Sequence, residues 1–254
     1  MDQLSKWFRV FKPVDAPVCR LICFPYAGGG ASVFRNWAPF LPDYVELLVL
    51  QLPGRENRIS ETCCVNMMEA VHSFDQVLSS KLDLPVFFFG HSMGAMIAYE
   101  YARFIRLNHH IEPAWLFLSG RSGPEEPRRG IDLNRLNDNE LIKEVTDNLG
   151  ASKMLLESSQ LAELFIKTMR ADLTMMDTYQ YIPDEPLSCP ITVLSGQSDM
   201  SFHSEELLKW RYQTSGNFST HYYAGGHLYL NTNTEALVNT LSSCIQLFAF
   251  KGGQ

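Results

Sequence analysis

The sequence lacks the features that would direct the chain to a membrane or to nucleic acid. None of its 254 residues lie in a run approaching the ~18 uninterrupted apolar residues of a membrane span, and the first residues contain no apolar core of a signal peptide. The formal net charge of −7 leaves no dense basic face for phosphates. We therefore expect a cytoplasmic protein that contacts neither a membrane nor nucleic acid.

The sequence also lacks the cysteine spacing of a zinc site. Six cysteines are present, but no pair of CxxC motifs occurs. Cys19 and Cys23 fall within an apolar run, and Cys63 and Cys64 are adjacent. This arrangement is typical of free thiols in a reducing compartment rather than of a disulfide framework.

The composition is that of a soluble globular domain, with 46% hydrophobic and 19% charged residues. Apolar runs bounded by Gly and Pro alternate with helical patterns, which predicts an α/β fold with a mostly parallel central sheet and helices on both faces. Strands are predicted at residues 18–24, 45–50, 86–89, 114–118, 191–194 and 219–223. Helices are predicted at residues 66–81, 93–107, 204–212 and 234–248. We expect one domain spanning residues 1–254.

One segment, residues 121–185, interrupts this alternation with helical patterns and no convincing strand. It is too long for an ordinary connection, so we expect a helical lid inserted between two core strands. Apolar residues recur in it at helical spacing, and they either pack the lid or line an acyl pocket. They are Leu141, Ile142, Val145, Leu149, Leu161, Leu164, Phe165 and Met169.

The stretch from Gly90 to Gly94 reads Gly-His-Ser-Met-Gly, directly after a buried strand and before a helix. This is the context of a nucleophile elbow, in which glycines two residues before and after the serine allow a very tight turn. The following helix directs free N–H groups and a positive dipole end toward the serine. We therefore predict Ser92 as the nucleophile of a hydrolase.

A base and an orienting acid should follow the nucleophile, in the order Ser, Asp or Glu, His. Asp199 follows the strand at 191–194 and His227 follows the strand at 219–223, so both come from the carboxyl edge of the sheet. Asp199 is the predicted acid and His227 the predicted base. His203 is a rival base, and Glu125 or Glu126 is an alternative acid.

Acyl transfer also needs N–H donors for an oxyanion. Met93, the residue after the nucleophile, supplies the first. Ala27 supplies the second, because it lies on the glycine-rich loop after the strand at 18–24. No Lys-Ser/Thr pair follows the glycines at 28–30, so a nucleotide-binding loop is disfavoured.

Several separate stretches, in the same order along nearly the whole chain, together resemble the type II thioesterases of nonribosomal peptide and polyketide synthases. They are Phe24-Pro25-Tyr26-Ala27-Gly28-Gly29-Gly30 with Phe34 and Trp37, Leu52-Pro53-Gly54-Arg55-Glu56 with Arg58, Gly90-His91-Ser92-Met93-Gly94, Arg170-Ala171-Asp172 and Gly225-Gly226-His227. The resemblance implies an α/β-hydrolase fold with a helical lid, a triad of Ser92, Asp199 and His227, and an oxyanion hole at Ala27 and Met93.

The resemblance further implies a substrate: acyl thioesters on the 4′-phosphopantetheine arm of acyl or peptidyl carrier proteins. No cofactor is expected, because the arm belongs to the carrier, and we expect a monomer. The predicted substrate-binding residues are Tyr26, Gly28, Met96, Arg128 and Arg129. Arg121 could join Arg128 and Arg129 in meeting the carrier or the phosphate of its arm, and Arg55 with Arg58 forms a second candidate pair.

Three other functions stay open at the level of sequence. The same motifs occur in medium-chain hydrolases that terminate fatty-acid synthesis. Acyl transfer to an alcohol or amine would differ from hydrolysis only in how water is excluded. A hydrolase fold that acts as a non-catalytic binding module is the third, although such proteins usually lack part of the triad.

Overall fold

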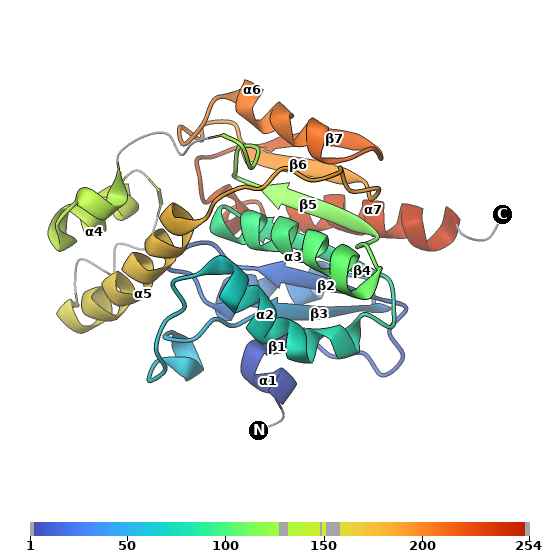
Figure 1. Ribbon diagram of the computed structural model, residues 1–254, viewed down its shortest axis with the longest axis horizontal. Coiled ribbons are helices and arrows are strands. Elements are labelled where there is room, and N and C mark those ends of the chain that lie inside the picture. Colours follow the sequence, from blue (N-terminus) through green and yellow to red (C-terminus); the bar gives the residue numbers. More distant parts are fainter. Residues whose placement is uncertain (1–2, 127–131, 148, 151–157, 252–254) are drawn as a thin grey trace.

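The computed structural model describes residues 3–126, 132–147, 149–150 and 158–251. A seven-stranded sheet of order β1-β3-β2-β4-β5-β6-β7 forms its centre (Figure 1). β1 pairs antiparallel with β3, and the other neighbours pair parallel. The strands are β1 (Phe8–Lys12), β2 (Cys19–Phe24), β3 (Val45–Leu50), β4 (Val86–His91), β5 (Trp115–Ser119), β6 (Ile191–Gly196) and β7 (Phe218–Tyr223).

The central strands are apolar on both faces because each face is covered. Phe88 belongs to the hydrophobic cluster on one face of the sheet, while Phe87 and Phe89 belong to the cluster on the other face. In the same way Ile22 faces the first cluster and Leu21 the second. This alternation, with side chains pointing to opposite faces in turn, gives the continuous apolar runs seen in the sequence.

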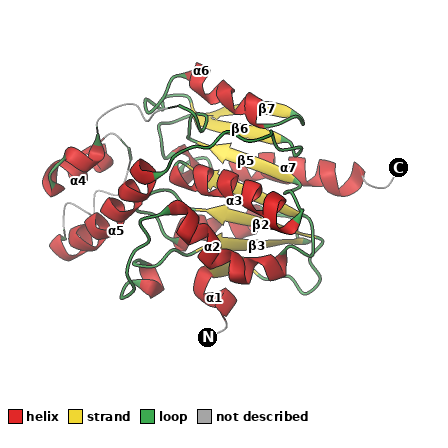
Figure 2. Cartoon of the chain, viewed as in Figure 1, coloured by secondary structure: helices red, strands yellow, loops and turns green. Residues whose placement is uncertain are grey.

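Helices cover both faces of the sheet (Figure 2). α2 and α3 pack on one face, and α7 packs with the 3-10 segment η1 (Ala31–Phe40) on the other. Asn66 caps α2 by accepting a hydrogen bond from the N–H of Glu69. The helices are α1 (Gln3–Trp7), α2 (Met67–Leu78), α3 (Met93–His109), α4 (Asp138–Asp147), α5 (Ser159–Thr178), α6 (Ser204–Leu207) and α7 (Thr234–Lys251).

α4 and α5 lie between β5 and β6 in the chain and stand beyond the carboxyl ends of the parallel strands (Figure 1). We call this stretch, from β5 to β6, the helical insertion. Some of its buried side chains form a small cluster distinct from the two clusters on the sheet, whereas Met175, Met176, Leu187 and Cys189 join the sheet cluster that contains α2 and α3. The buried members of the small cluster are Leu133, Leu141, Val145, Met169 and Leu173.

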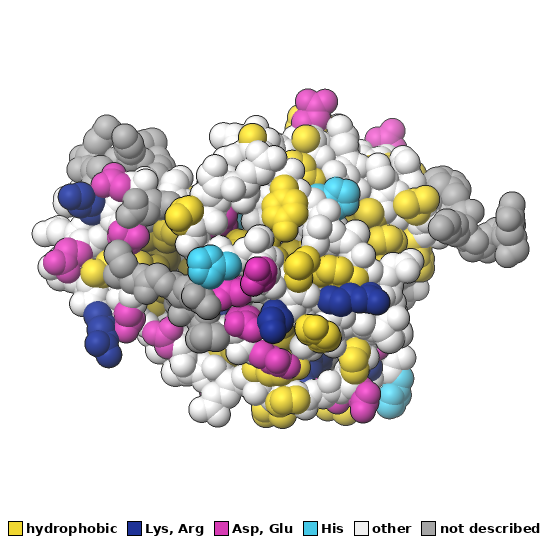
Figure 3. Space-filling model, turned by 90° about the horizontal axis from the view of Figure 1, so that it is seen from above, with side chains coloured by type: hydrophobic (Ala, Val, Ile, Leu, Met, Phe, Trp, Pro, Cys, Tyr) yellow, Lys and Arg dark blue, Asp and Glu magenta, His cyan; other side chains and the backbone are white. Residues whose placement is uncertain are grey.

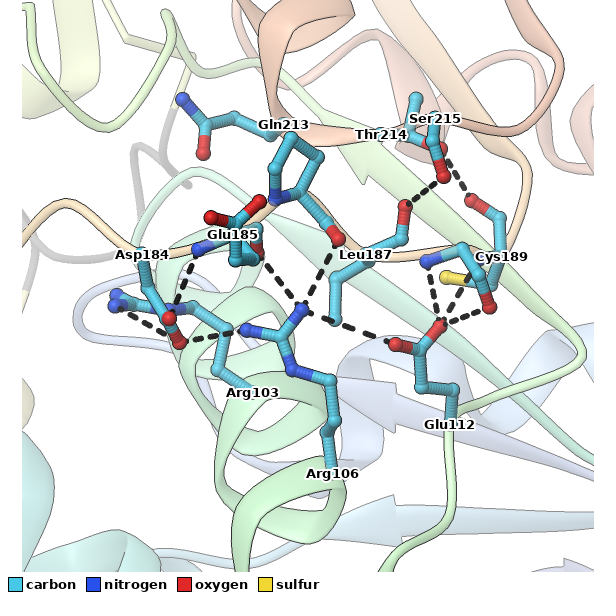
Figure 4. A network of polar contacts seen from close by, with 12 residues as sticks. Arg103, Arg106, Glu112, Asp184, Glu185, Leu187, Cys189, Gln213, Thr214 and Ser215 are labelled. Atoms are coloured by element: carbon cyan, nitrogen blue, oxygen red, sulfur yellow. Dashed lines mark hydrogen bonds and ion pairs between the residues drawn. The ribbon is translucent and has the colours of Figure 1, made fainter.

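The segment that returns from α5 to β6 is fixed by polar contacts to the end of α3 and the loop after it (Figure 4). Arg106 binds the carboxylate of Asp184 at 2.6 Å and donates to the carbonyl oxygens of Glu185 and Pro186. Glu112 accepts hydrogen bonds from Ser188 and from the backbone of Cys189. The insertion is therefore tied at its return end to the helix that begins at the predicted nucleophile.

Several elements differ from the sequence-based expectation, and neither the helix α1 nor the 3-10 segment η1 was predicted. The strand β1 was not predicted, because Phe8 is its one fully buried side chain and no apolar run marks it. The helix predicted at residues 204–212 is a four-residue α-helix, α6, followed by the 3-10 segment Leu208–Gln213. No helix in the described ranges is long and apolar enough to cross a membrane.

Candidate active site

Ser92 stands at the joint between β4 and α3 with φ 55° and ψ −114°, a conformation that non-glycine residues rarely adopt. Its surroundings enforce this turn. A Cβ on Gly90 would collide with the carbonyl group of Gly94, and a Cβ on Gly94 would collide with the carbonyl group of Phe24. The Ser92 N–H donates to the carbonyl oxygen of Ser119 at 2.7 Å. The half-buried Ser92 thus lies at the N-terminus of α3, as the elbow pattern predicts.

Asp199 and His227 come together beyond the ends of β6 and β7. Nδ1 of His227 lies 2.7 Å from Oδ2 of Asp199, whose side chain is fully buried. The backbone N–H of Ser201 donates to the other carboxylate oxygen at 3.0 Å. The pKa of Asp199 is lowered: burial alone would raise it, but the hydrogen bond and charge of His227 outweigh that effect. An ionised Asp199 can hold the imidazole and stabilise its cation.

The loops that carry these two side chains are packed directly against each other. The Ser198 N–H donates to the carbonyl oxygen of Gly225 at 2.9 Å. A Cβ on Gly196 would collide with the carbonyl oxygen of Gly226, so the two backbones approach more closely than side chains would permit. The acid and the base are therefore placed by main-chain geometry.

His91, which directly precedes Ser92 in the chain, lies close to the predicted base: its ring centroid is 4.9 Å from that of His227. In the part of the chain that the structure describes, neither the Ser92 hydroxyl nor Nε2 of His227 makes a hydrogen bond. Both atoms thus keep their hydrogen-bonding capacity for a substrate, and catalytic hydrogen bonds often form or tighten only when substrate binds. Ser92, Asp199 and His227 stay our predicted triad.

The loop after β2 has the form expected of an oxyanion loop. Gly29 donates its N–H to the carbonyl oxygen of Tyr26 at 2.9 Å, and Gly28 donates its N–H to Asp172 at 2.8 Å. Within the described residues, no acceptor is found for the N–H of Ala27 or for that of Met93. These two groups stay our predicted oxyanion donors.

The predicted substrate-binding residues occupy different environments. Tyr26 is half-buried, with its ring edge-on to His91 at 5.7 Å, and burial raises its pKa. Gly28 has φ 77° and faces the insertion, where a Cβ would lie 2.7 Å from the ring of Phe165. Met96 is fully buried in the cluster under α3, away from solvent. Tyr26 and Gly28 are therefore better placed than Met96 to touch a substrate.

The basic residues considered for the carrier fall into two groups. Arg128 and Arg129 lie outside the described residues. Arg55 and Arg58 are each only 4% exposed and bind carboxylates, Asp172 and Glu61 respectively, so these two arginines are structural. On the face seen in Figure 3, the described basic side chains are interspersed with acidic ones.

Asp172 belongs to the Arg170-Ala171-Asp172 motif, but the sequence alone predicts no role for it. It lies on α5, fully buried, and binds Arg55 through both oxygens at 2.6 and 2.7 Å. Arg55 also donates to the carbonyl oxygen of Gly29. Burial would lower the pKa of Arg55, but the Asp172 charge raises it above its usual value. The pair therefore joins the insertion to the predicted oxyanion loop. A lone carboxylate on the apolar face of α5, between Met169 and Leu173, is the signal that could have revealed it.

The alternatives for the acid and base are placed elsewhere. His203 caps the N-terminus of α6. Glu126 lies 4.0 Å from Lys209. Asp199, by contrast, binds His227 directly.

A serine at a strained elbow and an Asp–His pair at the carboxyl edge of a mostly parallel sheet define an α/β hydrolase of the serine type. The chain belongs to the thioesterase family, since the family model described as "Thioesterase domain" matches residues 19–245. It is an enzyme of that class, and the predictions of fold and family are confirmed.

Named relatives and solved structures are similar over almost the whole chain. The gramicidin S biosynthesis protein GrsT of Aneurinibacillus migulanus is 36% identical, with 97% of this chain and 96% of the relative aligned. The thioesterase PikA5 of Streptomyces venezuelae is 34% identical over 93% of this chain and 84% of its own. The structure of the type II thioesterase BorB from the borrelidin biosynthetic cluster superimposes with a TM-score of 0.86 at 31% identity, covering 94% of this chain and 97% of that one.

Proposed function

We propose that this chain hydrolyses acyl thioesters on the 4′-phosphopantetheine arms of carrier proteins in a nonribosomal peptide or polyketide synthase, and so removes stalled or misprimed acyl groups. The observations that carry the proposal are the Asp199–His227 pair, 2.7 Å apart, and a serine in an elbow conformation, which come from the same carboxyl edge of the sheet. The relatives named above, from gramicidin S and borrelidin biosynthesis among others, support the choice of pathway.

In the first half of the reaction, Oγ of Ser92 attacks the thioester carbonyl while Nε2 of His227 takes the hydroxyl proton. Asp199 holds the imidazole through Nδ1 and stabilises the cation that forms. The N–H groups of Ala27 and Met93 bind the oxyanion. The C–S bond then breaks, and the proton on His227 passes to the departing sulfur.

In the second half, water replaces the thiol. His227 takes a proton from the water as its oxygen forms a bond to the acyl carbon, and the bond from that carbon to Oγ of Ser92 breaks. The proton on His227 returns to Ser92. The products are a free acid and a carrier protein with its thiol restored.

We propose that the protein acts as a monomer in the cytoplasm and binds no cofactor of its own, with the helical insertion as a lid over the acyl group. Free cysteines fit a reducing compartment: all six are unpaired, and burial raises the pKa of Cys19 to about 11 and that of Cys189 to about 12. Phe165 and Met169 of α5 approach Gly28, which places the insertion against the predicted oxyanion loop.

The test is release of acyl groups from a phosphopantetheinylated carrier protein loaded with acetyl, aminoacyl or medium-chain groups. We expect hydrolysis across these loads, with a preference for short or aberrant ones, and a loss of about a thousandfold or more in Ser92→Ala. Near wild-type turnover in Ser92→Ala would refute the mechanism. Sharp selectivity for medium chains would instead support a fatty-acid chain terminator, and transfer of the acyl group to an added amine would support an acyltransferase.

A further inference from the structure

Ser119, the last residue of β5, binds the backbone of the predicted nucleophile and two buried side chains that lie near the nucleophile and the base in sequence. It is fully buried and lies in register with His91 on β4. Its carbonyl oxygen accepts the N–H of Ser92 at 2.7 Å. Its hydroxyl lies 2.8 Å from Nδ1 of His91 and 2.6 Å from the hydroxyl of Tyr229. A hydroxyl can donate one hydrogen bond and accept others, so this oxygen can link two partners at once.

The two side chains that this hydroxyl binds, those of His91 and Tyr229, are close in sequence to the predicted nucleophile and base. His91 directly precedes Ser92 in the chain, and Tyr229 follows His227 by two positions. The rings of His91 and Tyr229 are 5.9 Å apart, and that of His91 is 4.9 Å from His227. The hydrogen bonds of Ser119 therefore connect His91, on the strand that ends at the nucleophile, with Tyr229, on the loop that carries the base. Asp199 takes no part in this connection.

The ring of His91 has little freedom to move. Gly120 has φ 60°, and a Cβ there would lie 2.5 Å from Cε1 of His91, so the residue after Ser119 leaves room for the ring and no more. Tyr26 packs edge-on against the same ring from the oxyanion loop. Burial lowers the pKa of His91 well below its usual value, so the ring stays neutral beside the base.

Packing alone does not account for three buried polar groups in a row. Their desolvation is costly, and apolar residues of the same shape would fill this space at little or no loss of stability. We propose that the Ser119 hydroxyl, with His91 and Tyr229, forms a positioning chain that fixes the imidazole of His227 relative to Ser92. Asp199 sets the orientation of the imidazole, and the positioning chain sets its distance from the nucleophile.

The test uses Ser119→Ala, Tyr229→Phe and the double variant, with p-nitrophenyl acetate as substrate, so it does not depend on the identity of the carrier protein. Each single change removes one hydroxyl and leaves the backbone bond to Ser92 in place. We expect kcat to fall roughly 10- to 100-fold with KM within twofold, because small misplacements of reacting groups have effects of that size. The double variant should be no slower than the slower single variant, since both changes break one chain.

Ser195→Ala is the matched control. Ser195 is buried near the end of the adjacent strand β6, and its hydroxyl donates to the carbonyl oxygen of Gly196. This variant should keep wild-type kcat, and thermal unfolding of all variants shows whether each is folded. The proposal is overturned if Ser119→Ala and Tyr229→Phe both keep kcat within twofold, if their effects multiply in the double variant, or if Ser195→Ala loses as much activity.

Ser92→Ala in the same assay separates this proposal from the proposed function. If Ser92→Ala loses turnover while the positioning variants keep it, the chain is not a positioning device but the serine mechanism stands. If Ser92→Ala itself keeps turnover, the serine mechanism fails and the positioning chain fails with it.

Discussion

The catalytic edge of the sheet and the helical insertion are held in place by different kinds of contact. At the edge, Ser92 is fixed by main-chain geometry, because Gly90 and Gly94 press against neighbouring backbone with no room for side chains. In the insertion, α4 and α5 pack on a cluster of five buried side chains, and α5 is held to the sheet by Met175 and Met176 and by side-chain bonds such as that between Arg55 and Asp172. The predicted catalytic groups are thus held by backbone contacts, whereas the groups expected to meet the acyl chain are held by side chains.

This difference suggests that the two regions have different roles, with catalysis at the edge of the sheet and movement in the insertion. Rigid backbone placement suits groups that must keep sub-ångström geometry. A region with a small core can open and close at low free-energy cost. Changes to the predicted catalytic side chains at the edge should therefore remove activity and leave stability, while changes to the ion pair and core of the insertion should act on stability first.

The largest effect is expected from Asp199→Asn at the catalytic edge. The amide can no longer hold His227 in the tautomer that accepts the Ser92 proton, so kcat should fall by about 10⁴ while the thermal unfolding temperature changes little. Asp43→Asn, at a fully exposed carboxylate paired with Lys12, is the control and should be silent. A loss of less than tenfold in Asp199→Asn would remove Asp199 from the triad.

The next largest effect is expected from Asp172→Asn in the insertion. It leaves the guanidinium of Arg55 buried without its counter-charge, which costs about 3–5 kcal/mol of unfolding free energy. Asp138→Asn removes the exposed partner of Arg170 and should cost about 1 kcal/mol or less. Urea unfolding of both variants measures the difference, and equal losses would show that the buried pair is not an anchor.

The contrast between backbone contacts at the edge and side-chain contacts in the insertion also explains how much of the site could be predicted from sequence. The elbow is a local pattern, since glycines at fixed spacing around Ser92 are what the turn requires. Asp199 and His227 followed from the order of strands and from the rule that sites form at the carboxyl edge of a parallel sheet. Both are constraints of backbone geometry, and such constraints can be recognised in a sequence as short motifs with fixed spacing.

The parts that sequence did not reveal depend on contacts between distant residues or on weak local patterns. Arg55 and Asp172 are 117 positions apart, and neither has a neighbour that indicates the other. The sequence suggested that Arg55 could bind the phosphate of the carrier's arm. The positive charge of an arginine is evident from sequence, but the carboxylate that it binds in the fold is not. The strand β1 combines one buried residue with exposed and half-buried ones, so a search for continuous apolar runs does not detect it.

A third prediction compares the same substitution in the two regions. Leu118→Ala on β5 opens a hole in the large cluster beneath α3, whereas Leu141→Ala opens one in the five-residue cluster of the insertion. We expect about 3–4 kcal/mol for Leu118 and about 2–3 kcal/mol for Leu141, because a small cluster can collapse around the cavity. Unfolding free energies measure this, and limited proteolysis should show cleavage in the insertion of Leu141→Ala. Equal losses would mean that the insertion is packed as firmly as the sheet.

The smallest effect concerns Arg58, three positions after Arg55. Arg55 reaches into the insertion, but Arg58 binds Glu61 within its own loop and lies over the ring of Trp7. The two hydrogen bonds from Arg58 lower the pKa of Glu61 to about 2. Since the pKa is depressed in the folded protein, the stabilisation is complete above the unfolded value of about 4.3 and is lost as the pH falls toward 2.

Glu61→Gln should therefore destabilise the protein at pH 7 and make progressively less difference below pH 4. The side chain of Glu61 is 33% exposed, so solvent screening limits the effect at pH 7 to about 1 kcal/mol. Glu163→Gln, at an exposed position on α5, should show no such dependence. Unfolding free energies of both variants between pH 2 and pH 7 provide the measurement. A loss in Glu61→Gln that stays constant down to pH 2 would show that the carboxylate acts through shape rather than charge.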